Sequence, residues 1–297
     1  MNPPQGPEQP AGEPPHRRGR PPEPISEEAG AAHRTWLEPV RSRFAASGLT
    51  LDELVDRSGF SKTRLSELLR GKGYYPRWEI TYSVVRALGI PVTPVRRLWR
   101  AAAVEADKNA TWIQNRISEV HTADGDTQPV AHRGLTLAMR DPYTTYAQAF
   151  LQSEQRARQA VTETFDILWL TWGEAAASPG TPRYAWELLR ARVLFRAPRR
   201  PNGHPDLRAA AFHTRAQAGI RDLGERLARI DALARFFDAI ARLPADQRDV
   251  TVLRYLCDVD PDAIPGIVGL SPAFAHTLDH HARGALHELF PDTDTQE

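Results

Sequence analysis

The stretch from residue 49 to residue 72, LTLDELVDRSGFSKTRLSELLRGK, constrains the fold more than any other part of the chain. Thr50 and Glu53 have the spacing of a capping box, in which each side chain bonds the other residue's backbone amide at a helix N-terminus. Gly59 follows where a tight turn needs a left-handed residue. Ser61 then has the character of a second N-cap. The pattern predicts two short helices joined by a tight turn.

The second of these helices is predicted to have a polar outer face. Three leucines form its inner side, and at about 100° per residue the opposite side holds four polar residues, namely Thr63, Ser66, Glu67 and Arg70. A helix with such a face fits the major groove of duplex DNA and reaches base edges. The neighbouring basic residues are predicted to contact phosphates, and they are Lys62, Arg64, Lys72 and Arg77. Ser61 exposes helix N-terminal amides that also favour a phosphate.

The local charge favours a polyanionic partner. Residues 33–108 hold 14 Lys and Arg against 8 Asp and Glu, a local net charge of +6, whereas the whole chain carries +1. A helical bundle without a ligand would explain the periodicity but not this cationic excess. Phosphates are the dominant partner for such a surface, so double-stranded DNA is the expected partner.

The helices around this motif complete a familiar pattern. Periodic apolar residues predict one helix before it, from Trp36 to Ala46, and two after it, from Trp78 to Leu88 and from Pro94 to Ala103. Five short helices with the tight turn between the second and third resemble the Cro/C1-type, or XRE-like, helix-turn-helix family. The matching residues are Leu49 to Leu54, Ser58 to Ser61, Leu65 to Lys72 and Val85 to Gly89. The resemblance implies a DNA-binding domain, and such domains often pair, so a homodimer is an expectation.

Residues 243–289 contain a second helix-turn-helix pattern. Leu243-Pro244 opens a helix that runs to Leu256, and Asp260-Pro261 caps another. Gly269 makes the turn, and Ser271-Pro272 caps a last helix. The apolar face of that helix is predicted to hold Phe274, Ala275, Leu278, Ala282, Ala285 and Leu289. This order of helices and turn resembles region 4 of sigma-70-family factors. The matching residues are Leu243-Pro244, Val252 to Leu256, Ile264, Ile267, Gly269 to Ser271, Ala282-Arg283 and Ala285-Leu286.

The block before it resembles sigma region 2, the unit that binds the polymerase clamp. The matching residues are Val161, Glu163-Thr164-Phe165, Leu168-Trp169, Trp172 and Trp186. Core packing is the expected role of Phe165, Trp169 and Trp172 taken singly. The pattern departs from the family at Gln159 and Thr162, where an Asp and a Gln are usual. It departs again at Ala263-Ile264-Pro265, where Glu-Ile-Ala is usual, and proline costs about 3 kcal/mol inside a helix unless the helix restarts there.

The charge of the rear segment argues against strong DNA binding there. Residues 231–297 hold 5 Lys and Arg against 12 Asp and Glu, a local net charge of −7. Phosphate binding depends on cations, so this segment is expected to keep a sigma-like fold and to suit a protein partner better than a duplex. If it contacts DNA, the candidate residues on its last helix are His276, Thr277, His280 and Arg283.

Other kinds of site find little support. His276 and His280 stand four apart on one helix face, but no carboxylate or cysteine completes a metal site. Cys257 is expected to be a small buried apolar residue, and a single cysteine fits a reducing cytosol. No cofactor motif or catalytic constellation occurs, so no enzyme is predicted. No apolar run is long enough for a membrane span and no secretory signal is visible. We therefore expect a cytoplasmic, nucleoid-associated protein.

The expected fold class is all-α, in several domains. The predicted units are a disordered proline-rich tail (1–32), an XRE-like domain (33–106), a linker (107–135), a sigma region 2-like domain (136–200), a linker or helix (201–230), a sigma region 4-like domain (231–290) and a tail (291–297). Residues 1–32 hold nine prolines, which favours disorder.

Three functional hypotheses follow. The first is a DNA-binding transcription regulator whose sigma-like half contacts RNA polymerase or a regulatory, anti-sigma-like protein. The second is an active alternative sigma factor that drives transcription initiation and carries an added DNA-binding domain. The third is an interaction scaffold whose contact with DNA is incidental.

Overall fold

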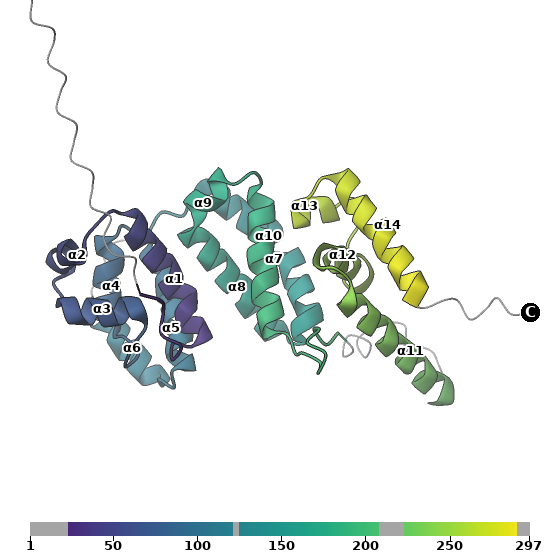
Figure 1. Ribbon diagram of the computed structural model, residues 1–297, viewed down its shortest axis with the longest axis horizontal. Helices are drawn as coiled ribbons and strands as arrows, with labels where there is room; N and C mark the ends of the chain where they lie inside the picture. The colour runs from purple at the N-terminus through teal and green to yellow at the C-terminus, as the bar shows by residue number, and fades with distance from the viewer. Residues whose placement is uncertain (1–22, 121–124, 208–222, 290–297) are drawn as a thin grey trace, which may run out of the picture.

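The described part of the molecule is built from helices. The computed structural model describes residues 23–120, 125–207 and 223–289, with the side chains of 223–232 and 289 excepted. These residues contain no strand beyond an isolated bridge between Arg199 and Pro205. The helices form three groups in a row along the long axis (Figure 1). The all-α prediction is confirmed, while the predicted tail 291–297, residues 1–22 of the other tail and 208–222 lie outside the described residues.

The first group, called the front unit below, contains helices α1 to α6. Their bounds are α1 (Ala31–Ala46), α2 (Leu51–Ser58), α3 (Lys62–Arg70), α4 (Trp78–Ala87), α5 (Val92–Glu105) and α6 (Ala110–Ser118). Three tryptophans, Trp36, Trp78 and Trp99, are completely buried at its centre. The rings of Trp78 and Trp99 lie 5.4 Å apart between centroids, a distance typical of favourable aromatic pairs. This core positions α2 and α3 at one surface.

Two predicted boundaries of the front unit are wrong. The expected linker 107–135 contains α6, because Trp112 stacks on Trp99 at 5.8 Å and Ile113 is buried in the same core. The expected disordered tail 1–32 is ordered from residue 23. Arg34 donates a hydrogen bond to the Ala29 carbonyl at 3.0 Å, and the Ser26 amide donates to the Arg70 carbonyl at 2.8 Å. Long-range contacts therefore order a segment whose local composition favours disorder.

The second group, the middle unit, contains four helices. They are α7 (Val130–Leu151), α8 (Glu154–Leu170), α9 (Trp172–Ala177) and α10 (Thr181–Arg196). Its core is aromatic: Tyr143 stacks on Phe165 with ring centroids 5.7 Å apart, and Tyr146 lies 4.6 Å from Trp186. Phe165 and Trp169 are buried, so the expected core role of these residues is confirmed.

The third group, the rear unit, follows α11 (Leu223–Arg242). It contains α12 (Ala245–Thr251), the π-helical turn η3 (Val252–Leu256), α13 (Ile264–Val268) and α14 (Pro272–Leu289). The helix expected from Asp260-Pro261 begins only at Ile264, after a turn. Pro265 lies in the first turn of α13, where the missing amide hydrogen would have had no helical partner. Phe274 was expected inside and is 47% exposed, whereas Ala275, Leu278 and Ala282 are buried as predicted.

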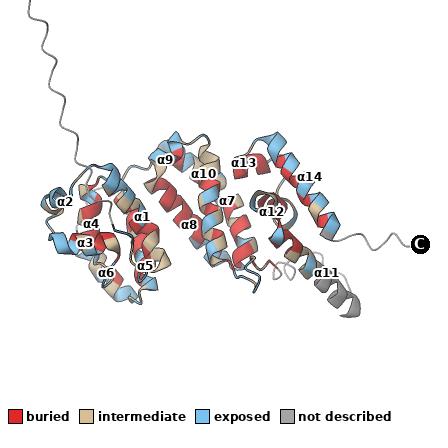
Figure 2. Ribbon diagram, viewed as in Figure 1, coloured by how far each residue is buried: buried red, intermediate tan, exposed pale blue. Residues whose placement is uncertain are grey.

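The units share cores instead of folding around separate ones. One cluster of buried side chains runs from Tyr143 in the middle unit to Leu286 in the rear unit. The front core likewise includes Ile167 of α8. Figure 2 shows buried residues on the facing sides of neighbouring helices in all three groups. The predicted separation of 136–200 from 231–290 by a linker therefore does not correspond to two independent cores.

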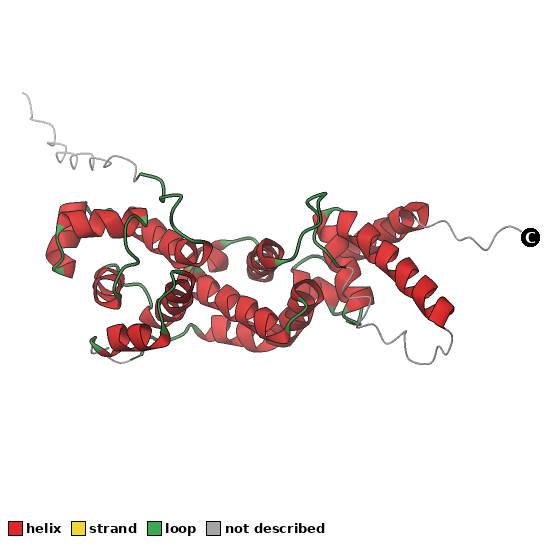
Figure 3. Cartoon of the chain, turned by 90° about the horizontal axis from the view of Figure 1, so that it is seen from below, coloured by secondary structure: helices red, strands yellow, loops and turns green. Residues whose placement is uncertain are grey.

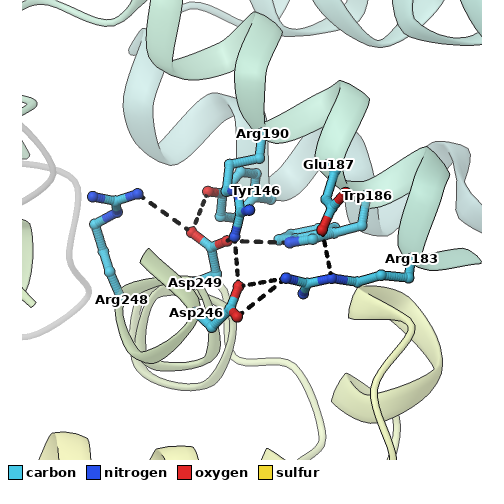
Figure 4. Close-up of polar contacts among 8 residues, drawn as sticks. All are labelled: Tyr146, Arg183, Trp186, Glu187, Arg190, Asp246, Arg248 and Asp249. Atoms are coloured by element: carbon cyan, nitrogen blue, oxygen red, sulfur yellow. Dashed lines mark hydrogen bonds and ion pairs between the residues drawn. The ribbon is translucent and has the colours of Figure 1, made fainter. Parts of the chain in front are cut away.

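A buried acidic cluster joins the rear unit to the middle unit (Figure 4). Asp249 of α12 is 1% exposed and accepts hydrogen bonds from Tyr146 at 2.7 Å and from Trp186 at 3.1 Å. Arg190 contacts Asp249 at 3.2 Å and Asp246 at 2.5 Å. Burial raises the pKa of Asp249, and Tyr146, Trp186 and Arg190 supply the donors that a buried carboxylate requires. The donors come from α7 and α10, so the cluster ties α12 to both helices.

A bidentate ion pair joins the front unit to the middle unit. The Arg97 side chain of α5 donates through Nε to both oxygens of Asp166 on α8, at 3.0 and 2.9 Å. Arg192 of α10 also donates to the Thr35 hydroxyl of α1 at 2.5 Å. Seen from below, the helices follow one another along the long axis and are connected by loops (Figure 3). All three units are thus joined by polar contacts as well as apolar packing.

Candidate nucleic-acid interface

The helix-turn-helix of the front unit has the predicted local geometry. The Glu53 amide donates to the Thr50 hydroxyl at 3.2 Å, and the Thr50 amide donates to the Glu53 carboxylate at 2.7 Å. The Thr50 hydroxyl also donates to the Glu53 carboxylate, at 2.8 Å, and the two donors of Thr50 stabilise its charged form and lower the pKa of Glu53. Gly59 ends α2 in the left-handed conformation, with φ at 74°. The capping box and the glycine turn are both confirmed, and together they set the direction in which α3 leaves α2.

Helix α3 presents the predicted polar face, with one difference at its start. Leu65, Leu68 and Leu69 are buried against the front core. Thr63 and Glu67 are exposed, whereas Ser66 and Arg70 are half-buried. Ser61 occupies the N-cap position in an extended conformation but makes no capping hydrogen bond with its side chain, so that prediction is wrong. The face available for base edges is therefore narrower than expected.

Two of the predicted DNA contacts are engaged within the protein. Lys62 pairs with Asp52 of α2 at 2.8 Å, with both side chains more than half exposed. Arg70 pairs with Glu23 at 2.9 Å and donates through Nε to the Ser66 carbonyl at 3.3 Å. Exposed ion pairs of this kind contribute about 0–1 kcal/mol, so a phosphate or base can replace either carboxylate at small cost.

The other predicted phosphate contacts converge on one cleft. Arg64 of α3, together with Lys72 and Arg77 from the loop before α4, lines a cleft of about 370 Å³. Among the described residues none of these three side chains forms an ion pair or a side-chain hydrogen bond. Glu67 lines the same cleft. The structure thus brings together four of the predicted residues from two separate segments.

The cleft also involves residues that the sequence did not single out. Tyr74 is 98% exposed at its edge, and Phe60 and Ile80 contribute apolar surface. The sequence signal for this loop was the pair of glycines in Gly71-Lys72-Gly73. Both adopt left-handed conformations, at φ 60° and 84°, and they shape the loop that carries Tyr74.

A buried histidine lies at the inner end of the cleft. His33 of α1 lines it, stacks on Trp36 with centroids 5.1 Å apart, and is 8% exposed. Burial, together with the neighbouring Arg34, lowers the pKa of His33 to about 4, so the ring is neutral near pH 7. The cationic charge of the cleft therefore comes from its exposed rim alone.

The second helix-turn-helix is packed differently. Gly269 forms the turn with φ at 68°, as predicted, but a Cβ atom added there would lie 2.2 Å from the Arg183 amide of α10. The turn is thus in close contact with the middle unit. On α14 the predicted residues His276, Thr277, His280 and Arg283 are all exposed. Arg283 pairs with the buried Asp279 at 3.2 Å, and Arg254 reaches the same carboxylate at 2.5 Å.

No group of three or more His, Cys, Asp or Glu in the described ranges of the chain is arranged to hold a metal ion. Cys257 is half-buried with a free thiol, and burial raises its pKa to about 12, which fits the predicted apolar role. In the same ranges no helix combines the length and apolarity that crossing a bilayer requires.

Comparison of the chain with protein-family models, with curated proteins and with solved structures finds no match. The geometry of the helices, the charges and the contacts described above are therefore the basis for a functional proposal.

Proposed function

We propose that this protein is a transcription regulator that binds duplex DNA through α3 of the front unit. The observation that carries the proposal is the combination of a short helix with an exposed polar face and, beside it, three cations that form no ion pair among the described residues, Arg64, Lys72 and Arg77. Thr63 and Glu67 would face base edges, and the three cations would bind phosphates. Arg70 would join them after exchanging Glu23 for the nucleic acid.

The rear unit is assigned a protein partner, namely RNA polymerase or a regulatory protein. Its arginines are already paired: Arg248 with Asp249, and both Arg254 and Arg283 with Asp279. The turn before α13 instead exposes three carboxylates, Asp258, Asp260 and Asp262. An acidic surface whose cations are engaged internally repels phosphates and favours a basic polypeptide surface.

The packing of the rear unit favours a regulator over an initiating sigma factor. The two sigma-like parts share one hydrophobic core, and the Gly269 turn lies against the start of α10. Run-off transcription with purified core polymerase tests this preference. We expect no promoter-dependent transcript from this protein alone, and such a transcript would favour the sigma hypothesis instead.

The DNA-binding assignment is tested with the full-length chain and a labelled 30-base-pair duplex at several salt concentrations. We expect the double variant Arg64→Ala, Arg77→Ala to weaken binding and to reduce the slope of log K against log salt by about 2, because about 0.9 counterion is released per phosphate contact. The matched control removes two exposed arginines elsewhere, Arg100→Ala and Arg133→Ala. Equal slopes for both double variants would contradict the proposal and support incidental contact with DNA.

A further inference from the structure

The cleft beside α3 has the size and mixed lining of a small-molecule site. Its volume of about 370 Å³ falls within the range of ligand pockets, roughly 300–1,000 Å³. Apart from the neutral His33, its buried lining is apolar, through Leu68 and Ile80 with the half-buried Phe60, and the exposed Tyr74 lies at its edge. A DNA backbone needs cations on an accessible surface, but it has no apolar group that would fill such a hollow.

The charged side chains at the rim of the cleft determine which charge a ligand should carry. Three cations, Arg64, Lys72 and Arg77, line it together with Glu67 and Glu79. Within the described residues none of these five side chains forms an ion pair, so each keeps its capacity for a ligand. An acidic group on an apolar body would pair with the cations while its body covers Ile80 and Phe60.

We propose that this cleft binds a small amphipathic anion, an aromatic or aliphatic acid, and that this ligand competes with DNA. The competition rests on the proposed function, because the three rim cations are also the predicted phosphate contacts. A ligand whose acidic group pairs with these cations occupies donors that the phosphates would need and lowers the local positive charge. Binding of the two would then be mutually exclusive, so the acid would act as an inducer that releases the protein from DNA.

The probe for this site is 8-anilinonaphthalene-1-sulfonate, an apolar anion whose fluorescence rises in apolar surroundings. It is titrated into the full-length wild type, Arg77→Gln and the matched control Arg100→Gln. Loss of one charge-assisted bond should raise the Kd about tenfold in Arg77→Gln and leave the control unchanged. Arg77 and Arg100 are both exposed, so neither change removes a buried contact. Equal affinities for all three proteins would overturn the proposal.

Competition is measured with a Cy5-labelled duplex bound to the wild type at low ionic strength. We expect the probe to release the duplex, while methanesulfonate, an equally charged anion without an apolar body, does not at the same concentration. Release by both anions alike, or simultaneous binding of probe and duplex, would overturn the inference.

If the duplex binds and the probe does not, the DNA-binding function stands and this inference fails. If the probe binds with the expected Arg77 dependence and no duplex binds, the cleft stands as a ligand site and both the regulatory competition and the proposed function fail.

Discussion

The front and rear units contain the same helix-turn-helix geometry, but they differ in the packing of the turn and in the pairing of the nearby cations. Each has a helix, a left-handed glycine and a second helix with a polar outer face, at Gly59 and at Gly269. No described atom lies within 4 Å of a Cβ atom added at Gly59, whereas one added at Gly269 meets the backbone of α10. Three of the cations beside α3 form no ion pair within the part of the chain that the structure describes, while those of the rear unit are paired with aspartates. A helix-turn-helix pattern therefore predicts geometry, and its surroundings decide whether a partner can reach it.

The largest expected effect comes from the cluster that holds the rear unit in place. Asp249→Ala should destabilise the protein by about 3–5 kcal/mol, because it leaves the Tyr146 hydroxyl and the Trp186 indole N–H without their acceptor and removes one of the two carboxylates that pair with Arg190. Urea unfolding followed by tryptophan fluorescence measures the loss. Asp262→Ala, at an exposed carboxylate of the same unit, is the control and should change stability by less than about 0.5 kcal/mol. Identical transitions for the two variants would show that the cluster does not stabilise this packing.

The two turn glycines give a matched pair of substitutions. Both positions have positive φ, so alanine costs about 1–2 kcal/mol at either one. Gly269→Ala carries the further cost of a Cβ atom 2.2 Å from the Arg183 amide, which should add about 1–3 kcal/mol. Chemical denaturation should therefore give a clearly lower free energy of unfolding for Gly269→Ala than for Gly59→Ala. Equal losses would mean that the rear turn is as free as the front one.

The front unit should also lose stability in acid through His33. Its pKa is about 4 in the folded protein against 6.5 for a free histidine, so the unfolded chain binds the proton more readily between these values. Stability should thus fall as the pH drops from about 6.5 to about 4, by up to about 3 kcal/mol in total. Unfolding midpoints at pH 7, 5 and 4 measure the slope, which His33→Gln should reduce. An unchanged slope in this variant would mean that other groups cause the acid sensitivity.

The smallest effect concerns the ion pair that occupies Arg70. Glu23→Gln should free this side chain and raise affinity for duplex DNA by up to about fivefold, since an exposed pair contributes roughly 0–1 kcal/mol. Fluorescence anisotropy at low salt is sensitive enough for this difference. Asp52→Asn makes the same change at Lys62 and allows the two candidate contacts to be compared. Weaker binding in Glu23→Gln would indicate that Glu23 positions Arg70 productively.

The sequence predicts those parts of the site that depend on residues close together along the chain. The Thr50–Glu53 capping box, the Gly59 turn and the leucine side of α3 each depend on residues a few positions apart. The pair between Arg70 and Glu23 spans 47 positions, and that between Arg183 and Asp246 spans 63. Arginines and carboxylates are too common for such partners to be chosen from sequence. The packing of the rear unit against the middle unit and the ion pair of Arg70 could therefore not be predicted from the sequence.

Helix α6 illustrates the same limit within the front unit. Its residues lack a strong apolar stripe, and its stability comes from Trp112 stacking on Trp99 and from the burial of Ile113. Such stacking partners come from a different helix, so the local pattern of residues 107–135 favoured a linker.

The continuous packing from α5 through α8 and α10 to α12 has a mechanical consequence for the proposed regulator. If α3 occupies a major groove, the acidic rear surface points in one fixed direction around the duplex axis, because no independent core allows it to swing. A partner bound to the adjacent DNA would meet that surface only at certain spacings, since each inserted base pair rotates the partner by roughly 35°. Activity in cells should therefore oscillate with the helical phase between the two sites and recover after one full turn of about 10 base pairs.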